Sequence, residues 1–244
     1  MPKNLRAVAR PVVVTKLKFS KPDRMSMQFP AERSIIYIPL LRNIERCIND
    51  FDQIPEGRKD TLMDLSRFVE KKISAGKNAE LIFICTHNSR RSHMAQLWAQ
   101  AAAAYYNIPA VHAYSGGTEV TAVNSSAIKA LEELGFRIRP TTKNENPVYE
   151  IRFSNDLPPL RGFSKKYDDP ENPKRGFGAI MTCSHADQNC PFVEGAEKRM
   201  TISFDDPKDF DGTPEESKMY KERAYQIGRE ILYSFSQIRI PSSK

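Results

Sequence analysis

Short apolar runs alternate with amphipathic stretches from residue 80 to the end of the chain. The runs have the length of buried strands and cover residues 80–84, 111–114, 177–182 and 199–204. Apolar residues recur at helical spacing over 92–106, over 125–134, and over a stretch that opens with a capping-box pattern at Thr213-Pro214-Glu215-Glu216 and continues to Ile238. This alternation predicts an α/β domain over residues 80–240, with a four-stranded parallel sheet flanked by helices.

Two amphipathic helices are predicted before this domain. Leu40, Ile44 and Cys47 share one helical face, and a second helix is expected over 58–75, where Gly76 suits a C-cap. We interpret residues 35–76 as a helical hairpin extension and Cys47 as a buried structural thiol.

Periodicity fails between residues 140 and 175. The segment is rich in proline and charge. It therefore predicts a long insertion loop at 140–175, with an edge strand over 148–153.

The composition is that of a soluble globular protein, with 244 residues of which 40% are apolar and 27% charged. No apolar run approaches the roughly 18 residues that a membrane span needs, so no membrane association is expected. Four cysteines are too few for a disulfide scaffold of this length. A reducing, cytoplasmic location is expected.

The net charge of +7 is concentrated at the N-terminus, where residues 1–33 carry eight Lys and Arg against two acidic residues. The rest of the chain is nearly neutral, which argues against a nucleic-acid partner. We expect residues 1–33 to be a basic, disordered leader. Two alternatives remain: an upstream extension from a misplaced start, given Met25 and Met27, or an organelle transit peptide.

The sharpest candidate for chemistry is Cys85-Thr86-His87-Asn88-Ser89-Arg90-Arg91-Ser92, which joins a predicted buried strand to a predicted helix. In this setting the loop N–H groups form an anion-binding nest, and Arg91 can donate two hydrogen bonds to an oxyanion. The same field favours a Cys85 thiolate, which is a nucleophile. Residues 86–92 are therefore candidate oxyanion-binding residues, with the Arg90 side chain expected to point outward. The alternative is a buried structural cysteine.

A second cysteine pair, Cys183-x6-Cys190-Pro191, follows the strand at 177–182. Because parallel strands end at the same rim of a sheet, Cys183 should emerge beside Cys85. Six polar residues suit a loop that can bend to form a disulfide. The alternatives are a zinc site made by Cys183, Cys190 and His185, for which no good fourth ligand is evident, or unrelated structural cysteines.

A carboxylate at the end of the fourth strand is the third candidate. In Asp205-Asp206-Pro207 it would lie on the same rim and could protonate a leaving oxygen. Loop formation is the commoner role of such a sequence.

From about residue 80 to its end, the chain resembles the low-molecular-weight protein tyrosine phosphatase superfamily and, within it, the thioredoxin-coupled arsenate reductases. The matching stretches are Ile82-Phe83-Ile84-Cys85-Thr86-x-Asn88-Ser89-x-Arg91-Ser92-x-Met94-Ala95-x-x-Trp98, Tyr114-Ser115-x-Gly117, Cys183-x6-Cys190-Pro191 and Phe204-Asp205-Asp206-Pro207. The resemblance implies these roles: Cys85 nucleophile, Arg91 oxyanion clamp, Asn88 loop orienter, Ser92 support of the thiolate, Ser115 a further supporting residue, and Asp206 general acid.

The resemblance also implies that Cys183 and Cys190 carry a disulfide outward to thioredoxin, the external reductant, with no bound cofactor or metal. The chain departs from the family at three positions in the Cys85 loop and the helix that follows it. His87 stands where a glycine is usual, Arg90 replaces a second loop cysteine, and Gln96 replaces an acidic residue that helps hold potassium in some reductases.

Three functions are consistent with these residues. The first is arsenate reduction through three thiols, the second is hydrolysis of phosphomonoesters or phosphotyrosine, and the third is a non-catalytic oxyanion-binding or redox-sensing module. Cys183 and Cys190 discriminate among them, because only the reductase needs both.

Overall fold

The computed structural model describes residues 36–190 and 192–240. The chain divides into Met1–Glu32 and one compact unit, Arg33–Lys244. The predicted leader at 1–33 lies outside the described residues. Among the described residues, no helix is both long and apolar enough to cross a membrane.

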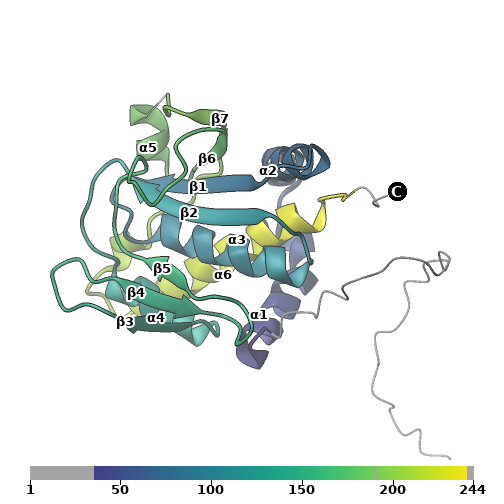
Figure 1. The fold of residues 1–244 in the computed structure, drawn as a ribbon. Coiled ribbons are helices and arrows are strands. Elements are labelled where there is room, and N and C mark those ends of the chain that lie inside the picture. The colour runs from purple at the N-terminus through teal and green to yellow at the C-terminus, as the bar shows by residue number, and fades with distance from the viewer. Residues whose placement is uncertain (1–35, 191, 241–244) are drawn as a thin grey trace, which may run out of the picture. The chain divides into compact units, whose positions relative to one another are not determined.

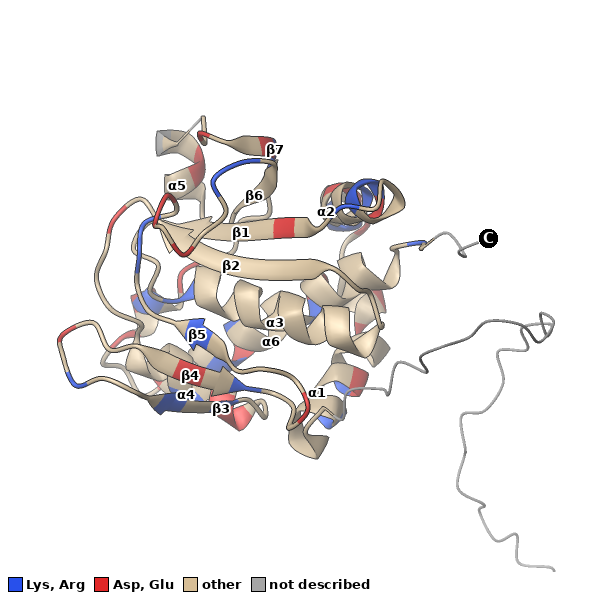
Figure 2. Cartoon of the chain, viewed as in Figure 1, with Lys and Arg blue, Asp and Glu red and all other residues tan. Residues whose placement is uncertain are grey.

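Four parallel strands form the central sheet in the order β2-β1-β6-β7 (Figure 1), which confirms the predicted architecture. They are β1 (Ala79–Cys85), β2 (Val111–Gly117), β6 (Phe177–Met181) and β7 (Ala196–Thr201). Along β1, Leu81 and Phe83 join one apolar cluster, and Ile82 and Ile84 join another on the opposite face. A strand covered on both faces is mostly apolar. Glu80 is the one charged residue in β1, and Figure 2 draws acidic residues of the chain in red.

The fourth strand lies earlier in the chain than the predicted 199–204. β7 ends at Thr201, yet the N–H groups of Ile202 and Phe204 still donate to the carbonyls of Met181 and Thr182. The chain therefore runs on beside the end of β6. This path brings the following acidic residues to the carboxyl edge of the sheet.

Helices pack on this sheet. α3 (Arg91–Tyr105) contacts β1, β2 and α6 (Glu216–Ser236), and α4 (Ser125–Glu133) packs on α6. On the other side, α5 (Ser184–Asn189) contacts β1 and β6. Gly228 of α6 has no room for a side chain, because a Cβ would lie 2.4 Å from the ring of Trp98. Close contact between α6 and α3 thus depends on this glycine.

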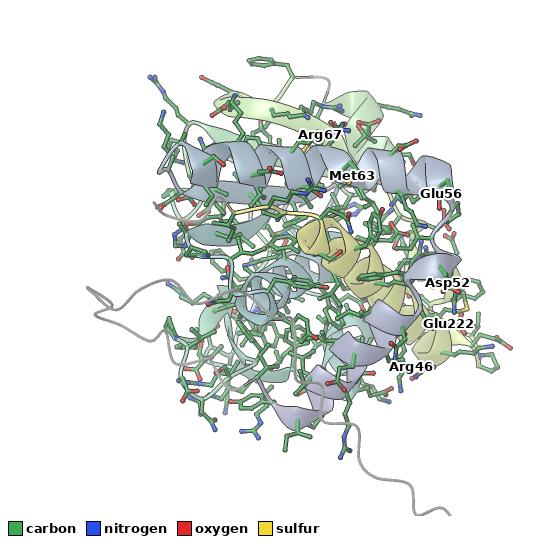
Figure 3. The ribbon with its side chains drawn as sticks, turned by 90° about the vertical axis from the view of Figure 1, so that its right-hand side faces the viewer. Arg46, Asp52, Glu56, Met63, Arg67 and Glu222 are labelled. Carbon is green, nitrogen blue, oxygen red and sulfur yellow. The ribbon has the colours of Figure 1, made fainter. Side chains whose placement is uncertain are left out.

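The two predicted N-terminal helices are present as α1 (Ile38–Asn49) and α2 (Glu56–Ser74), with the short helix η1 (Phe51–Gln53) between them. Each packs against α6, which lies between them (Figure 3, where Arg46, Met63 and Glu222 mark α1, α2 and α6). Their buried side chains, such as Leu40, belong to the same apolar cluster as the sheet. The extension therefore shares the core of the domain.

The last helix begins later than its capping-box pattern predicts. α6 begins at Glu216 without a side-chain cap, and the Thr213 hydroxyl donates to the Phe210 carbonyl instead. The Glu216 carboxylate accepts from the Gly212 N–H and from the Ser126 hydroxyl of α4. The carboxylate of the expected capping box therefore has a partner on α4, and α6 has no side-chain cap.

The predicted insertion forms a second sheet together with the strand just before it. Antiparallel strands β3 (Arg137–Pro140), β4 (Tyr149–Arg152) and β5 (Leu160–Gly162) occur in that order. β4 corresponds to the strand expected over 148–153, but it is the middle strand, because β5 pairs with its free edge. After β5 the chain returns to the central sheet, where Tyr167 N–H donates to the Gly117 carbonyl.

Candidate active site

The predicted Cys85–Ser92 segment joins β1 to α3. The residues that follow β2 pack against this loop. Glu119 N–H donates to the Thr86 carbonyl, and the Ser89 hydroxyl donates to the Ala122 carbonyl. Gly117 permits this approach, since a Cβ there would lie 2.7 Å from the Thr86 oxygen and 2.8 Å from the Asn88 nitrogen. The loop is therefore held from outside as well as by its own turns.

A directed chain of hydrogen bonds ends at the Cys85 sulfur. The Lys165 N–H donates to Asn88 Oδ1 at 2.9 Å, so the other end of that amide, Nδ2, is a donor, and it lies 2.9 Å from Ser92 Oγ. Ser92 can then direct its own proton to Cys85 Sγ, 3.1 Å away. Asn88 adopts a φ of 45°, a left-handed conformation that asparagine tolerates better than most residues. The arrangement places a hydrogen-bond donor against the Cys85 sulfur.

Arg91 carries the donors that an oxyanion would use. Its Nη1 donates to the Phe204 carbonyl at 2.9 Å, and its Nη2 is bonded to the Asp206 carboxylate. Its Nε is buried and has no hydrogen-bond partner among the described residues. An incoming oxyanion can therefore accept from Nε and compete with Asp206 for Nη2.

Asp206 lies at the mouth of the loop, at the start of the short helix η2 (Pro207–Phe210). It accepts from the Lys208 N–H as well as from Arg91. The structure thus brings the predicted acid and the predicted clamp into direct contact.

Arg90 does not point outward, and that expectation is wrong. Its Nε donates to the Tyr220 hydroxyl at 2.6 Å, and its Nη2 to Asp211 at 2.9 Å. Tyr220 in turn donates to Asp211 at 2.6 Å. Arg90 therefore ties the loop to α6 and to the segment that follows Asp206.

Cys183 and Cys190 stand at the two ends of α5, not on the flexible loop that was predicted. Cys183 is buried, accepts from the Ala186 N–H at 3.3 Å, and lies 3.6 Å from the Thr86 hydroxyl. Cys190 follows the helix, and burial raises the pKa of its thiol although Arg199 opposes the shift. Together with Cys85 these two cysteines belong to one apolar cluster. In the described stretches of the chain, no group of three or more His, Cys, Asp and Glu could hold a metal ion.

The His87 side chain lies outside the loop. It is half-exposed, and its Nε2 is 3.3 Å from the Glu119 carboxylate. The residue that replaces the usual glycine thus adds an imidazole–carboxylate contact at the rim.

His93 was missed by the sequence analysis, although it is buried behind the loop. Because the Asn88 carbonyl can only accept, Nε2 of His93 carries the proton at 2.9 Å, and Nδ1 accepts from the Ser115 hydroxyl at 3.3 Å. Burial lowers the pKa of His93 to about 3, with Lys165 adding to the shift. The imidazole is therefore a neutral support that connects Ser115 to the loop.

His93→Gln is expected to reduce the acid sensitivity of the fold. The native state keeps His93 neutral, whereas the unfolded chain protonates it below its ordinary value of 6.5. Stability is therefore retained above pH 6.5 and falls by about 1.4 kcal/mol per pH unit below it. Urea unfolding at several pH values should show a shallower decline for His93→Gln. The exposed His112→Gln variant should follow the wild type, and equal slopes for all three proteins would contradict the assignment.

The insertion supplies the other residues that the sequence did not reveal. The Ser164 hydroxyl donates to the His87 carbonyl at 2.8 Å and accepts from the Thr121 N–H at 2.9 Å. Lys165 is buried, and burial lowers its pKa. No periodicity marks this segment, so no local signal could have placed it at the loop.

Comparison with known proteins identifies relatives of a large part of this chain. No family model matches the sequence. The arsenate reductase of Halalkalibacterium halodurans is 29% identical over 152 residues, 62% of this chain and 91% of that protein. The arsenate reductase of Staphylococcus aureus (strain Newman) is 34% identical over 128 residues, 52% of this chain and 77% of that protein. A low molecular weight protein tyrosine phosphatase from T. tengcongensis has a TM-score of 0.46 and 19% identity, covering 66% of this chain and 100% of that one.

The two sequence matches extend over most of the length of each reductase. With 34% identity across 77% of a known member, the chain belongs to the arsenate reductase family.

Proposed function

We propose that the protein reduces arsenate to arsenite through three thiols, with thioredoxin as the external reductant. The observation that carries the proposal is the position of Cys183, which lies 3.6 Å from the hydroxyl of Thr86, the residue next to Cys85. A second thiol at the loop is needed to resolve an adduct on Cys85. The sequence relatives named arsenate reductase support the same substrate.

The first step forms a covalent adduct on Cys85. Its thiolate attacks arsenic, an As–O bond breaks, and Asp206, once protonated, gives its proton to the leaving oxygen. Arg91 holds the remaining arsenate oxygens in place of the Asp206 carboxylate. The product is a Cys85 thiol ester of arsenic(V).

The second step transfers electrons. The Cys183 thiolate attacks the Cys85 sulfur, so that the S–S bond forms and the S–As bond breaks. The bonding pair stays on arsenic, which is reduced from arsenic(V) to arsenic(III) and leaves as arsenite. Two thiols are oxidised to one disulfide, and the electrons balance.

The third step moves the disulfide outward, and it requires α5 to unwind. Cys183 and Cys190 flank a six-residue helix, so their Cα atoms are separated by about 10 Å along a helical path. A disulfide needs Cα atoms roughly 4.4–6.8 Å apart.

Amide hydrogen exchange over residues 184–189 should therefore become faster when the Cys183–Cys190 disulfide forms. Unchanged protection in the oxidised protein would contradict this step.

Phosphoester hydrolysis is the second candidate. It requires Cys85, Arg91 and Asp206, and the contact of the Arg91 guanidinium with the Asp206 carboxylate supports it. In that reaction Asp206 would act first as acid and then as base. Cys183 and Cys190 would have no chemical role.

One assay separates the two functions. Purified protein is supplied with arsenate, thioredoxin, thioredoxin reductase and NADPH, and in parallel with p-nitrophenyl phosphate. The proposal predicts arsenate-dependent NADPH oxidation with equimolar arsenite. Turnover of p-nitrophenyl phosphate without any arsenate-dependent NADPH oxidation would instead support the hydrolase.

Arg91→Lys is expected to lower turnover by about 100-fold or more, because an ammonium cannot replace a planar fork of donors on a tetrahedral oxyanion. Arg90→Lys is the matched control, since it keeps a cation near Tyr220 and Asp211. Steady-state kinetics should show a much smaller loss for the control. Equal losses in the two variants would mean that Arg91 has no special contact with the oxyanion.

A further inference from the structure

The Thr86 hydroxyl lies between a thiol and an imidazole. Its Oγ1 is 3.6 Å from Cys183 Sγ and 3.1 Å from His185 Nδ1. Thr86 and Cys183 are both buried, whereas His185 is exposed. The three side chains therefore form a continuous path from a buried sulfur to a residue at the surface.

We propose that His185 is a positioning residue that withdraws the Cys183 proton through the Thr86 hydroxyl. The proposal rests on the proposed function, because it assumes that Cys183 is the thiol that attacks Cys85. The S–H proton passes to Thr86 Oγ1 while the hydroxyl proton passes to His185 Nδ1. One S–H and one O–H bond break, one O–H and one N–H bond form, and nothing is oxidised. The products are a Cys183 thiolate and a His185 imidazolium.

Hydrogen bonding is complete before and after this transfer. Before it, Cys183 donates to Thr86, which donates to His185; afterwards both bonds point the other way, without movement of heavy atoms. The Ala186 N–H donates to Cys183 Sγ at 3.3 Å in addition. An ionised sulfur in an apolar cluster needs such donors in place of water. The exposed His185 can then release its proton to solvent.

Other titratable groups surround α5 from each neighbouring element. Asp187 of α5 is paired with Arg199 of β7, which also donates to the Cys190 carbonyl. Around the sheet edge lie Cys85 and Arg91 of the loop and the His87–Glu119 pair at its rim. Tyr167 also lies there, and burial and the neighbouring Cys190 raise its pKa. His185 is the imidazole that contacts the Thr86 hydroxyl.

The test measures Cys183 directly and needs no arsenate. Full-length protein carrying Cys85→Ser and Cys190→Ser is treated with 2,2′-dithiodipyridine between pH 6 and pH 9.5, and mass mapping follows modification of Cys183. The remaining thiol, Cys47, is buried, and burial raises its pKa to about 12. His185→Gln and Thr86→Val are added to this background. Thr86→Ser is the rescue variant, and the exposed His112→Gln is the control.

The relay predicts that His185→Gln and Thr86→Val each slow the Cys183 reaction by about 100-fold at pH 7. Near pH 9.5 their rates should converge on that of the background protein, because hydroxide then ionises the thiol without a base. Thr86→Ser and His112→Gln should match the background at every pH.

Two outcomes would overturn the proposal. One is a pH profile of His185→Gln that equals the background. The other is a uniform slowing at all pH values, which assigns His185 a structural role in α5. Arsenate reduction by the wild-type protein is measured separately. If the wild-type protein does not reduce arsenate but His185→Gln still changes the pH profile of Cys183, the proposed function is rejected and the proton relay is retained.

Discussion

Cys85→Ser is expected to abolish arsenate reduction and phosphoester hydrolysis while the fold is retained. The substitution preserves shape, and the Ser92 and Asn88 contacts behind it can persist. A serine hydroxyl is a poor nucleophile without a base to remove its proton. Ser92, which contacts the sulfur, donates a hydrogen bond and cannot act as that base. The loop therefore provides no base that could remove the proton of a serine hydroxyl at position 85.

Cys47→Ser is the matched control for this prediction. Cys47 is also buried, but it lies on α1 and contacts the Tyr225 carbonyl at 3.8 Å, outside the site. Both variants are compared by steady-state turnover and by thermal unfolding. The control should keep its activity. Turnover in the Cys85→Ser protein would remove Cys85 from the role of nucleophile.

Cys190→Ser is expected to convert the enzyme from many turnovers to about one. Cys183 can still attack Cys85 and release arsenite, but no third thiol remains to take over the disulfide. A Cys85–Cys183 disulfide should therefore accumulate. Cys183→Ser should stop one step earlier, with the arsenic adduct on Cys85 and no arsenite released.

Single-turnover arsenite release, with mass mapping of disulfides, distinguishes these outcomes. A hydrolase would retain phosphatase activity in both variants, apart from modest losses through packing. If Cys190→Ser reduced arsenate over many turnovers and trapped no disulfide, the three-thiol scheme would be wrong.

Much of the fold and part of the candidate site could be predicted because their signals are local. The buried strand at residues 79–85, the Cys85–Ser92 loop and the helix after it are contiguous, so periodicity alone shows where the loop lies. The parallel order of the strands then places Cys183 and Asp206 at the same rim. The shifted start of α6 shows the limit of such signals, since the Glu216 carboxylate of the expected capping box accepts from Ser126, 90 residues away.

The α/β architecture, the Cys85–Ser92 loop and the pair of outer cysteines could be predicted because hydrophobic period and residue spacing encode them. The orientation of these groups depends on tertiary packing. The Lys165 N–H, 77 residues away in sequence, orients the side-chain amide of Asn88. The Arg91 guanidinium contacts the carboxylate of Asp206, which is 115 residues away. The direction of a hydrogen bond depends on which donor faces which acceptor after packing. No pattern along the chain records that pairing.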